Sequence, residues 1–293
     1  MTDGRLKLNE PMDKHTSWRV GGTADRFYVP ADIDDLAGFL AGLPSDEELI
    51  FIGLGSNLLI RDGGIRGTVV AMKNVINELE LLDDDRMKVG AGVPCARVAR
   101  LSVKAGLSGA EFLIGIPGTM GGALAMNAGA FGGETWAIVT AVETIDRRGK
   151  IFERLPEDYE IGYRTVALPA EEWFISATLQ LQQMTSNSEG DRLRELLARR
   201  SETQPMGEFS CGSVFRNPPG DYAARLIEAC GLKGKQIGGA RVSDKHANFI
   251  INTGNATAAD IEELIESVAE EVEKKQGIRL ECEVRIVGET VKC

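Results

Sequence analysis

The chain has 293 residues, of which 43% are hydrophobic and 26% are charged, and its formal net charge is -11. This length allows two or three domains, and the hydrophobic content excludes a wholly disordered protein. The acidic balance disfavours nucleic acid and anionic membrane surfaces as partners, so a small molecule is the expected ligand.

The five cysteines are scattered without a C-x-x-C pair, and the chain has only two histidines. This pattern predicts reduced thiols in a reducing compartment and no metal site. Residues 1–14 contain no apolar run typical of a signal peptide. We therefore expect a cytoplasmic protein.

The first two thirds of the chain alternate short apolar runs with amphipathic ones. Helices are predicted at residues 33–43, where Asp32 is a plausible N-cap, and at 93–105, where Gly106 ends the pattern. Strands are predicted at residues 26–29, 49–52, 67–72, 87–90, 141–146, 150–155 and 173–181. This order of elements indicates α/β subdomains.

A polar segment at residues 182–190 precedes a charged helix at 191–202, and this change of composition predicts a domain boundary. Beyond it we predict a helix at 222–229, a strand at 247–251 and a long helix after Thr257, where Thr-Ala-Ala-Asp forms a capping box. A last strand is predicted at 278–286, because apolar and charged residues alternate there. Its charged face either meets water or lines a site.

Residues 115–133 read GIPGTMGGALAMNAGAFGG and carry no charge. Glycine costs about 1 kcal/mol in a helix interior relative to alanine. This glycine block therefore indicates positive φ angles or main-chain N–H groups that approach a ligand, for which an extended phosphate cofactor is the first candidate. Two alternatives are a tight structural crossover packed through Gly121 and Gly122 and a membrane helix, which Pro117 and Asn127 disfavour.

A second glycine-containing loop, GLGSN at residues 53–57, follows a predicted strand. It lacks the third glycine of a dinucleotide fingerprint, and no P-loop motif occurs in the chain. Two separated loops with exposed N–H groups can cradle a pyrophosphate from two sides. The predicted cofactor contacts are Gly53, Gly55, Ser56, Asn57, Ile116, Pro117, Gly118, Thr119, Gly121, Gly122, Asn127, Ala128 and Gly129.

Six motifs occur in a fixed order along the chain: GLGSNLLIRDGG, IPGTMGGALAMNAGAFGGE, Tyr163-Arg164, CGSVFRNP, RVSDKHANFIIN and ECEVRIVG. In this order they resemble the UDP-N-acetylenolpyruvoylglucosamine reductase family. The resemblance implies an α+β protein. Its FAD-binding fold is of the vanillyl-alcohol-oxidase type, with two α/β subdomains at residues 1–75 and 76–200, and a C-terminal α/β substrate-binding domain follows at 201–293. The short span between Arg164 and Trp173 resembles the shorter second type of the family, which lacks a loop with a substrate-binding tyrosine.

The resemblance also implies the reaction. NADPH would reduce FAD, and the reduced flavin would transfer hydride to the enolpyruvyl ether of a UDP-linked sugar, forming UDP-N-acetylmuramate. That product belongs to peptidoglycan synthesis, and hence to cell wall biogenesis, cell shape and cell division. The expected assembly is a monomer or a weak oligomer, and no membrane partner is expected.

Hydride addition to an enol ether conjugated to a carboxylate leaves negative charge on the neighbouring carbon and the carboxylate oxygens, so an acid and a charge stabiliser are needed. By resemblance, Ser213 would donate the proton. Arg164 would bind the carboxylate and the developing enolate with its fork of donors. Glu283 would orient groups or relay a proton. The implied substrate contacts are Tyr163, Asn217 and Arg285, and a second polar patch comprises Arg241, Ser243, His246 and Asn248.

Two positions depart from the family pattern. Cys282 stands where proline is more usual, and Val166 stands where serine often occurs. Because proline fixes φ and cysteine does not, the first change bears on the backbone path into Glu283. Cys211 and Cys282 are expected to be small buried hydrophobes, and we hypothesise that they lie near one another beside the active site. His246 is expected to be structural.

Two other functions compete with the reductase interpretation. One is an FAD oxidase of the same superfamily that uses oxygen and acts on another substrate. The other is a noncatalytic regulator that binds FAD or a nucleotide. Arg164, Ser213 and Glu283 in their motifs favour the reductase.

Overall fold

The computed structural model describes residues 4–169, 171–185 and 188–291. The chain folds into two compact units. The first unit comprises Met1–Lys7, Phe27–Gly53 and Thr68–Arg200, and the second comprises Leu8–Arg26, Leu54–Gly67 and Ser201–Cys293. The three-part division at residues 75 and 200 stays a prediction.

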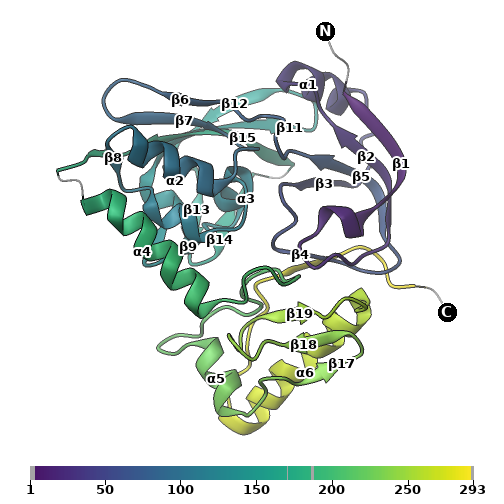
Figure 1. Ribbon diagram of the computed structural model, residues 1–293. Helices are drawn as coiled ribbons and strands as arrows, with labels where there is room; N and C mark the ends of the chain where they lie inside the picture. The colour runs from purple at the N-terminus through teal and green to yellow at the C-terminus, as the bar shows by residue number, and fades with distance from the viewer. Residues whose placement is uncertain (1–3, 170, 186–187, 292–293) are drawn as a thin grey trace. The chain divides into compact units, whose positions relative to one another are not determined.

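A five-stranded sheet of order β12-β11-β15-β7-β6 forms the centre of the first unit (Figure 1). Its antiparallel pairs join β11 to both β12 and β15, and β7 to both β15 and β6. Strand β15 reads EWFISATLQ, and its aromatic and β-branched residues are typical of a buried strand. The strands are β6 (Leu79–Leu81), β7 (Arg86–Gly90), β11 (Val139–Asp146), β12 (Ile151–Arg154) and β15 (Glu172–Gln180).

Helices α2 (Cys95–Lys104) and α3 (Met120–Ala125) lie on one face of this sheet (Figure 1). Val89 of β7, Val98 of α2 and Leu124 of α3 are completely buried in one apolar cluster. Burial of side chains of this size stabilises each by about 1.5–3 kcal/mol. This cluster therefore holds the glycine block, which contains α3, against the sheet.

A second sheet, of order β1-β2-β5-β3, includes strand segments of the first unit. Strands β3 (Leu49–Ile52) and β5 (Ile65–Ala71) pair in parallel, and the predicted bounds of β3 are confirmed. Helix α1 (Ile33–Ala41) begins as predicted, because the N–H of Asp35 donates to Asp32 Oδ1 at 2.8 Å. The remaining strands are β1 (Arg5–Pro11) and β2 (Thr23–Val29).

The second unit contains an antiparallel sheet of order β17-β18-β19, helix α5 (Ala223–Ala229) and helix α6 (Ala258–Gln276). Thr257 and Asp260 form the predicted capping box of α6. Its apolar stripe of Ile261, Leu264, Ile265, Val268 and Val272 is buried, as predicted. The strands are β17 (Gln236–Ile237), β18 (Ala240–Val242) and β19 (Ile250–Asn252).

The prediction of one strand over residues 278–286 is wrong for most of that length. Burial does alternate there, with Leu280 and Val284 buried and Glu281 exposed. The segment changes partners, however. Cys282 forms an isolated antiparallel β-bridge with Phe215, whereas β20 (Arg285–Val287) pairs in parallel with β4 (Leu58–Ile60). The alternation of apolar and charged residues therefore reflects packing against two different segments, and not one continuous strand. The strand predicted at 247–251 likewise begins only at β19.

Shorter elements complete the described chain. Helix α4 (Ser188–Thr203) contains the predicted charged helix. No helix among the described residues is long and apolar enough to cross a membrane. The short strands are β8 (Leu107–Ser108), β9 (Gly129–Ala130), β10 (Gly133–Glu134), β13 (Glu160–Gly162), β14 (Thr165–Ala167) and β16 (Gln182–Gln183), and the 3-10 helices are η1 (Met12–His15), η2 (Glu111–Gly115), η3 (Thr135–Ile138) and η4 (Pro156–Asp158).

Candidate active site

Most glycines of the block serve close packing, not positive φ. Within residues 115–133, the only glycine with a positive φ is Gly132, beside the non-glycine residues Asn127 and Phe131. A Cβ on Gly121 would lie 2.9 Å from the Cβ of Ala91. A Cβ on Gly122 would meet nothing closer than the hydroxyl of Thr119, at 4.0 Å. The crossover interpretation therefore explains Gly121, while Gly122 keeps an open surface.

Thr119 joins the glycine block to the end of β3 in the first unit. A Cβ on Gly53 would lie 2.2 Å from Thr119 Oγ1, so this contact requires glycine. The Gly118 carbonyl accepts a bond from Cys95, and the N–H of Met120 donates to Val93. The N–H groups of Gly118 and Thr119 donate to no other described residue. Main-chain N–H groups without an internal acceptor are what an anion-binding loop requires.

The loop at residues 55–57 belongs to the second unit. Gly55 has a φ of 60°, and a Cβ there would lie 2.0 Å from the His15 carbonyl oxygen. The N–H groups of Gly55 and Ser56 donate to no acceptor in the described part of the chain. Asn57 donates from Nδ2 to the Glu283 carbonyl at 3.0 Å, and its own carbonyl accepts the N–H of Arg285. This predicted cofactor loop therefore lies directly beside the Glu283 backbone.

Arg164 lies at the turn of the β13–β14 hairpin, with a left-handed φ of 55°. Its Nη2 donates to the Gly129 carbonyl at 2.7 Å, and its Nη1 donates to the Asn127 carbonyl at 3.3 Å. The guanidinium carbon lies 5.2 Å from the centre of the Tyr163 ring, which is 45% exposed. The glycine block thus orients Arg164, and Tyr163 offers the adjacent aromatic surface.

Ser213 follows Gly212, whose φ is 74°, and its hydroxyl donates to no other residue that the structure describes. The next two residues are held by Asn248, a buried residue of the predicted polar patch. Val214 donates to the Asn248 carbonyl at 2.9 Å. Phe215 donates to Asn248 Oδ1 at 2.9 Å and accepts from Nδ2 at 2.8 Å. Asn248 therefore fixes the backbone that presents Ser213.

The structure brings Ser213 and Glu283 to neighbouring positions of two paired segments. The N–H of Glu283 donates to the Val214 carbonyl at 2.7 Å. Of the three predicted catalytic residues, these two belong to the second unit, and Arg164 belongs to the first. Among the predicted substrate contacts, Asn217 caps α5 by accepting the N–H of Ala223 at 3.1 Å, and Arg285 is exposed at the start of β20.

Sequence reasoning missed Glu134. Its Oε2 accepts a hydrogen bond from Asn127 Nδ2 at 3.1 Å, so Glu134 is linked to Arg164 through Asn127. A signal was present, because Glu134 is the first charge after the uncharged run of residues 112–133.

Cys211, Cys282 and His246 lie in the second unit. Cys211 and Cys282 contribute to the same apolar cluster. Burial raises the pKa of Cys211 to about 12, and burial also raises the pKa of Cys282. Burial lowers the pKa of His246, whose ring centre lies 4.7 Å from that of Phe249. Thiols with raised pKa values are poor nucleophiles. The hypothesis that the two cysteines lie beside the active site stays open.

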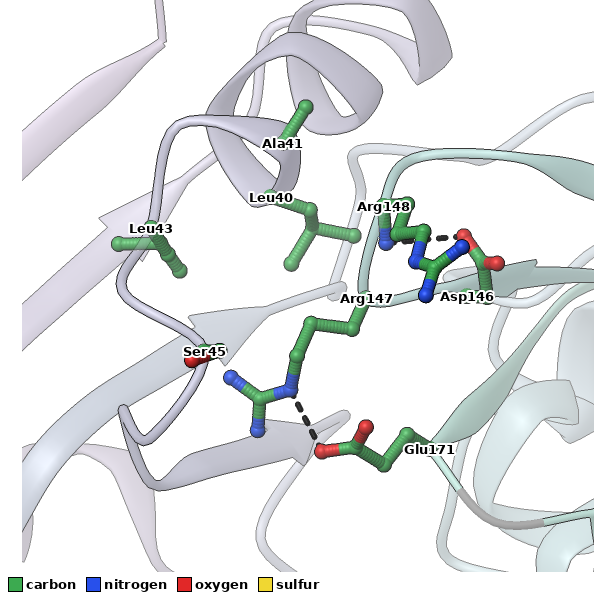
Figure 2. A pocket seen from close by; sticks show the side chains of 8 residues that line it. All are labelled: Leu40, Ala41, Leu43, Ser45, Asp146, Arg147, Arg148 and Glu171. Carbon is green, nitrogen blue, oxygen red and sulfur yellow. Dashed lines mark hydrogen bonds and ion pairs between the residues drawn. The ribbon is translucent and has the colours of Figure 1, made fainter.

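A cavity of about 440 Å³ lies in the first unit, between the end of α1 and the β11–β12 turn. Figure 2 shows the side chains that line it. Arg147 donates from Nε to Glu171 at 2.6 Å, so its charge is already neutralised. None of the predicted site residues lines this cavity. Its lining residues are Leu40, Ala41, Leu43, Ser45, Asp146, Arg147, Arg148 and Glu171.

Residues 24–154 match the FAD binding domain family, and residues 204–287 match the family described as UDP-N-acetylenolpyruvoylglucosamine reductase, C-terminal domain. The reductase of that name from Methylococcus capsulatus is 59% identical over 281 residues, which cover 96% of this chain and 92% of that relative. The one from Alkalilimnicola ehrlichii is 56% identical over 286 residues, 98% of this chain and 96% of that relative.

A crystal structure of UDP-N-acetylenolpyruvylglucosamine reductase from Thermus caldophilus has a TM-score of 0.84 and 33% identity to this chain, covering 98% of this chain and 99% of that one. The matches confirm the predicted fold class, α+β with an FAD-binding part followed by a C-terminal α/β domain. They also confirm the resemblance drawn from the motifs. The chain therefore belongs to the UDP-N-acetylenolpyruvoylglucosamine reductase family.

Proposed function

We propose that this chain uses NADPH to reduce the enolpyruvyl ether of UDP-N-acetylglucosamine enolpyruvate, forming UDP-N-acetylmuramate. The observation that carries the proposal is the pairing of the Ser213 and Glu283 segments, with 2.7 Å between Glu283 N and Val214 O, inside the part of the chain that matches the family's C-terminal domain. This pairing supports an acid and a carboxylate that act on one substrate.

The residues of both glycine loops fit FAD. Gly122 leaves an open surface, and the N–H groups of Gly118, Thr119, Gly55 and Ser56 have no acceptor among the described residues, as phosphate binding requires. When bound, FAD supplies the hydride chemistry, because it accepts hydride from NADPH and transfers it to the enolpyruvyl group. We propose that both loops contact FAD. Their further predicted contacts are Gly53, Asn57, Ile116, Pro117, Gly121, Ala128 and Gly129.

Three side chains perform the remaining chemistry. Arg164, whose guanidinium is fixed by two carbonyls, binds the substrate carboxylate and stabilises the enolate charge. Ser213 donates its hydroxyl proton to the carbon that becomes negatively charged, and no described residue competes for that proton. Glu283 orients these groups or relays a proton to the Ser213 oxygen.

Further substrate contacts follow from the exposed residues near these groups. Tyr163 presents its ring beside Arg164, and Arg285 and Asn217 lie in the second unit with Ser213. We assign the protein to the cytoplasm and, through its product, to peptidoglycan synthesis, cell shape and cell division. We expect a monomer or a weak oligomer.

The test begins with the purified chain under anaerobic conditions. We expect a yellow protein that bleaches on addition of NADPH. Subsequent addition of the enolpyruvyl sugar restores the colour, and mass spectrometry of the product shows a gain of two hydrogen atoms. A colourless protein, or a sugar that leaves with unchanged mass, contradicts the proposed function.

A further inference from the structure

The end of the glycine block forms a closed hydrogen-bond network around Arg164 in the first unit, with Asn127 at its centre. The Asn127 residue is only 2% exposed, and its backbone is left-handed with a φ of 44°. Few residues other than glycine adopt that conformation, and asparagine is among those that tolerate it best. The backbone geometry of the network therefore favours asparagine at this position.

Every polar group of Asn127 has a partner within the protein. Its main-chain N–H donates to the Leu124 carbonyl at 3.3 Å. Its Oδ1 accepts the N–H of Trp136 at 3.1 Å. Its Nδ2 donates to Glu134 Oε2 and to the Gly162 carbonyl, each at 3.1 Å. A side-chain amide has two donor hydrogens, and both are used here. No donor of Asn127 is left for a phosphate oxygen.

Asn127 holds Arg164 at two points. The Gly162 carbonyl that accepts from Nδ2 lies two residues before Arg164, so this bond ties the hairpin backbone to the block. The main-chain carbonyl of Asn127 accepts Arg164 Nη1 at 3.3 Å, which ties down the guanidinium. Together the two bonds fix the position of the hairpin backbone at Arg164 and the position of its guanidinium group.

Glu134 completes the network from β10. It pairs with Gly129 in the β9–β10 ladder, and the Gly129 carbonyl accepts Arg164 Nη2 at 2.7 Å. Its carboxylate takes one hydrogen of the Asn127 amide. Glu134 therefore sets the orientation of that amide, since Oδ1 must face Trp136 and Nδ2 must face the carboxylate.

We infer that Asn127 is a positioning residue for Arg164, supported by Glu134, and that its side chain does not contact FAD. The inference rests on the proposed function, in which Arg164 binds the substrate carboxylate. A reacting group displaced by about 1 Å slows catalysis by about 100-fold. Loss of the Asn127 bonds therefore slows the step that consumes the enolpyruvyl sugar. It does not change FAD binding or reduction by NADPH.

The test uses Asn127→Asp in the FAD-loaded enzyme. This change keeps the size of the side chain and the acceptor for Trp136 but removes both donors. We expect normal flavin content, normal bleaching by NADPH, and reoxidation by the enolpyruvyl sugar that is about 10- to 100-fold slower than in the wild type. Asn77→Asp is the matched control, because exposed Asn77 donates to the Asn74 carbonyl within a surface turn of the same unit. It should react at wild-type rates.

Rescue distinguishes positioning from a general structural role. Adding Glu134→Gln to Asn127→Asp supplies a donor to the new carboxylate, so part of the lost reoxidation rate returns. If Asn127→Asp does not fold, Glu134→Ala tests the same network, because it removes one acceptor of the Asn127 amide. We expect the same selective slowing of reoxidation, by a smaller factor. Loss of FAD from either variant contradicts the inference.

A double-mutant cycle with Arg164→Ala separates this inference from the proposed function. Residues that act through one another are not additive, so Asn127→Asp should add no further slowing in the Arg164→Ala background. If the full effect of Asn127→Asp persists there, Asn127 does not act through Arg164. If Arg164→Ala alone reoxidises at the wild-type rate, the proposed role of Arg164 fails.

Discussion

Two buried asparagines, one in each unit, support the proposed catalytic residues in different ways. Asn127 in the first unit bonds both the hairpin that carries Arg164 and the guanidinium itself. Asn248 in the second unit bonds the backbone of Val214 and Phe215, next to Ser213. The comparison shows that a long side chain needs support along its length, whereas a serine is placed once its backbone is fixed.

The largest effect is expected from substitution of Ser213 in the second unit. Ser213→Ala removes the proposed proton donor without changing the Asn248 bonds. General acids contribute about 100- to 10,000-fold to rates, so reoxidation of the reduced flavin by the enolpyruvyl sugar should slow by a factor in that range. Stopped-flow absorbance of the flavin measures this step. Bleaching by NADPH should stay normal, and Ser108→Ala serves as the control. Full turnover by Ser213→Ala contradicts its role.

The next test breaks the backbone support while keeping the serine. Asn248→Asp removes the donor to the Phe215 carbonyl. A buried acceptor left without its partner costs about 1–3 kcal/mol. We expect the free energy of unfolding, measured by urea denaturation, to fall by this amount. Sugar-dependent reoxidation should slow as well. A stable variant with slow reoxidation would instead mean that Asn248 contacts the substrate directly.

A glycine pair isolates backbone conformation from packing. A Cβ on Gly212 or on Gly38 meets no atom within 4 Å, but only Gly212 has a positive φ, of 74°. An L-residue in the left-handed region costs about 1–2 kcal/mol, so Gly212→Ala should lower the free energy of unfolding by this amount and slow reoxidation. Gly38→Ala lies within helix α1 and should stabilise by about 0.5–1 kcal/mol. Equal effects at both positions would exclude backbone strain as the cause.

The smallest effect concerns pH. Burial holds the pKa of His246 below its ordinary value of 6.5, so the unfolded chain binds this proton more readily than the folded chain. The contribution of His246 to stability is therefore complete above pH 6.5 and is lost as pH falls through and below that value. His246→Gln should lose less stability than the wild type between pH 7.5 and pH 5.5, as measured by urea unfolding. An identical pH dependence of the two proteins contradicts this assignment.

Local chemistry made much of the fold predictable. Asp32 and Thr257 mark helix starts because their side chains accept N–H groups only three residues away. Strand β3 was predicted to the residue, since its apolar run is bounded by Gly53. Interactions between residues this close in the chain can be predicted from the sequence pattern alone.

The parts that could not be predicted depend on distant partners. The segment before β20 changes partners between Cys282 and Arg285, and alternation alone does not report such a change. The Arg164 network joins residues 35 and 37 positions apart. The sequence indicated Asn127 as a cofactor contact, and for its main chain this stays a prediction. The bonds of its side-chain amide to Glu134 and Gly162 could not be predicted from the pattern.

The most direct test of the reductase account compares two oxidants on the wild-type enzyme. The flavin is reduced anaerobically with one equivalent of NADPH and then mixed, in separate stopped-flow experiments, with the enolpyruvyl sugar or with oxygen. The account predicts rapid return of the flavin absorbance with the sugar and slower return with oxygen. Rapid reoxidation by oxygen with no response to the sugar would contradict it and would identify an oxidase instead.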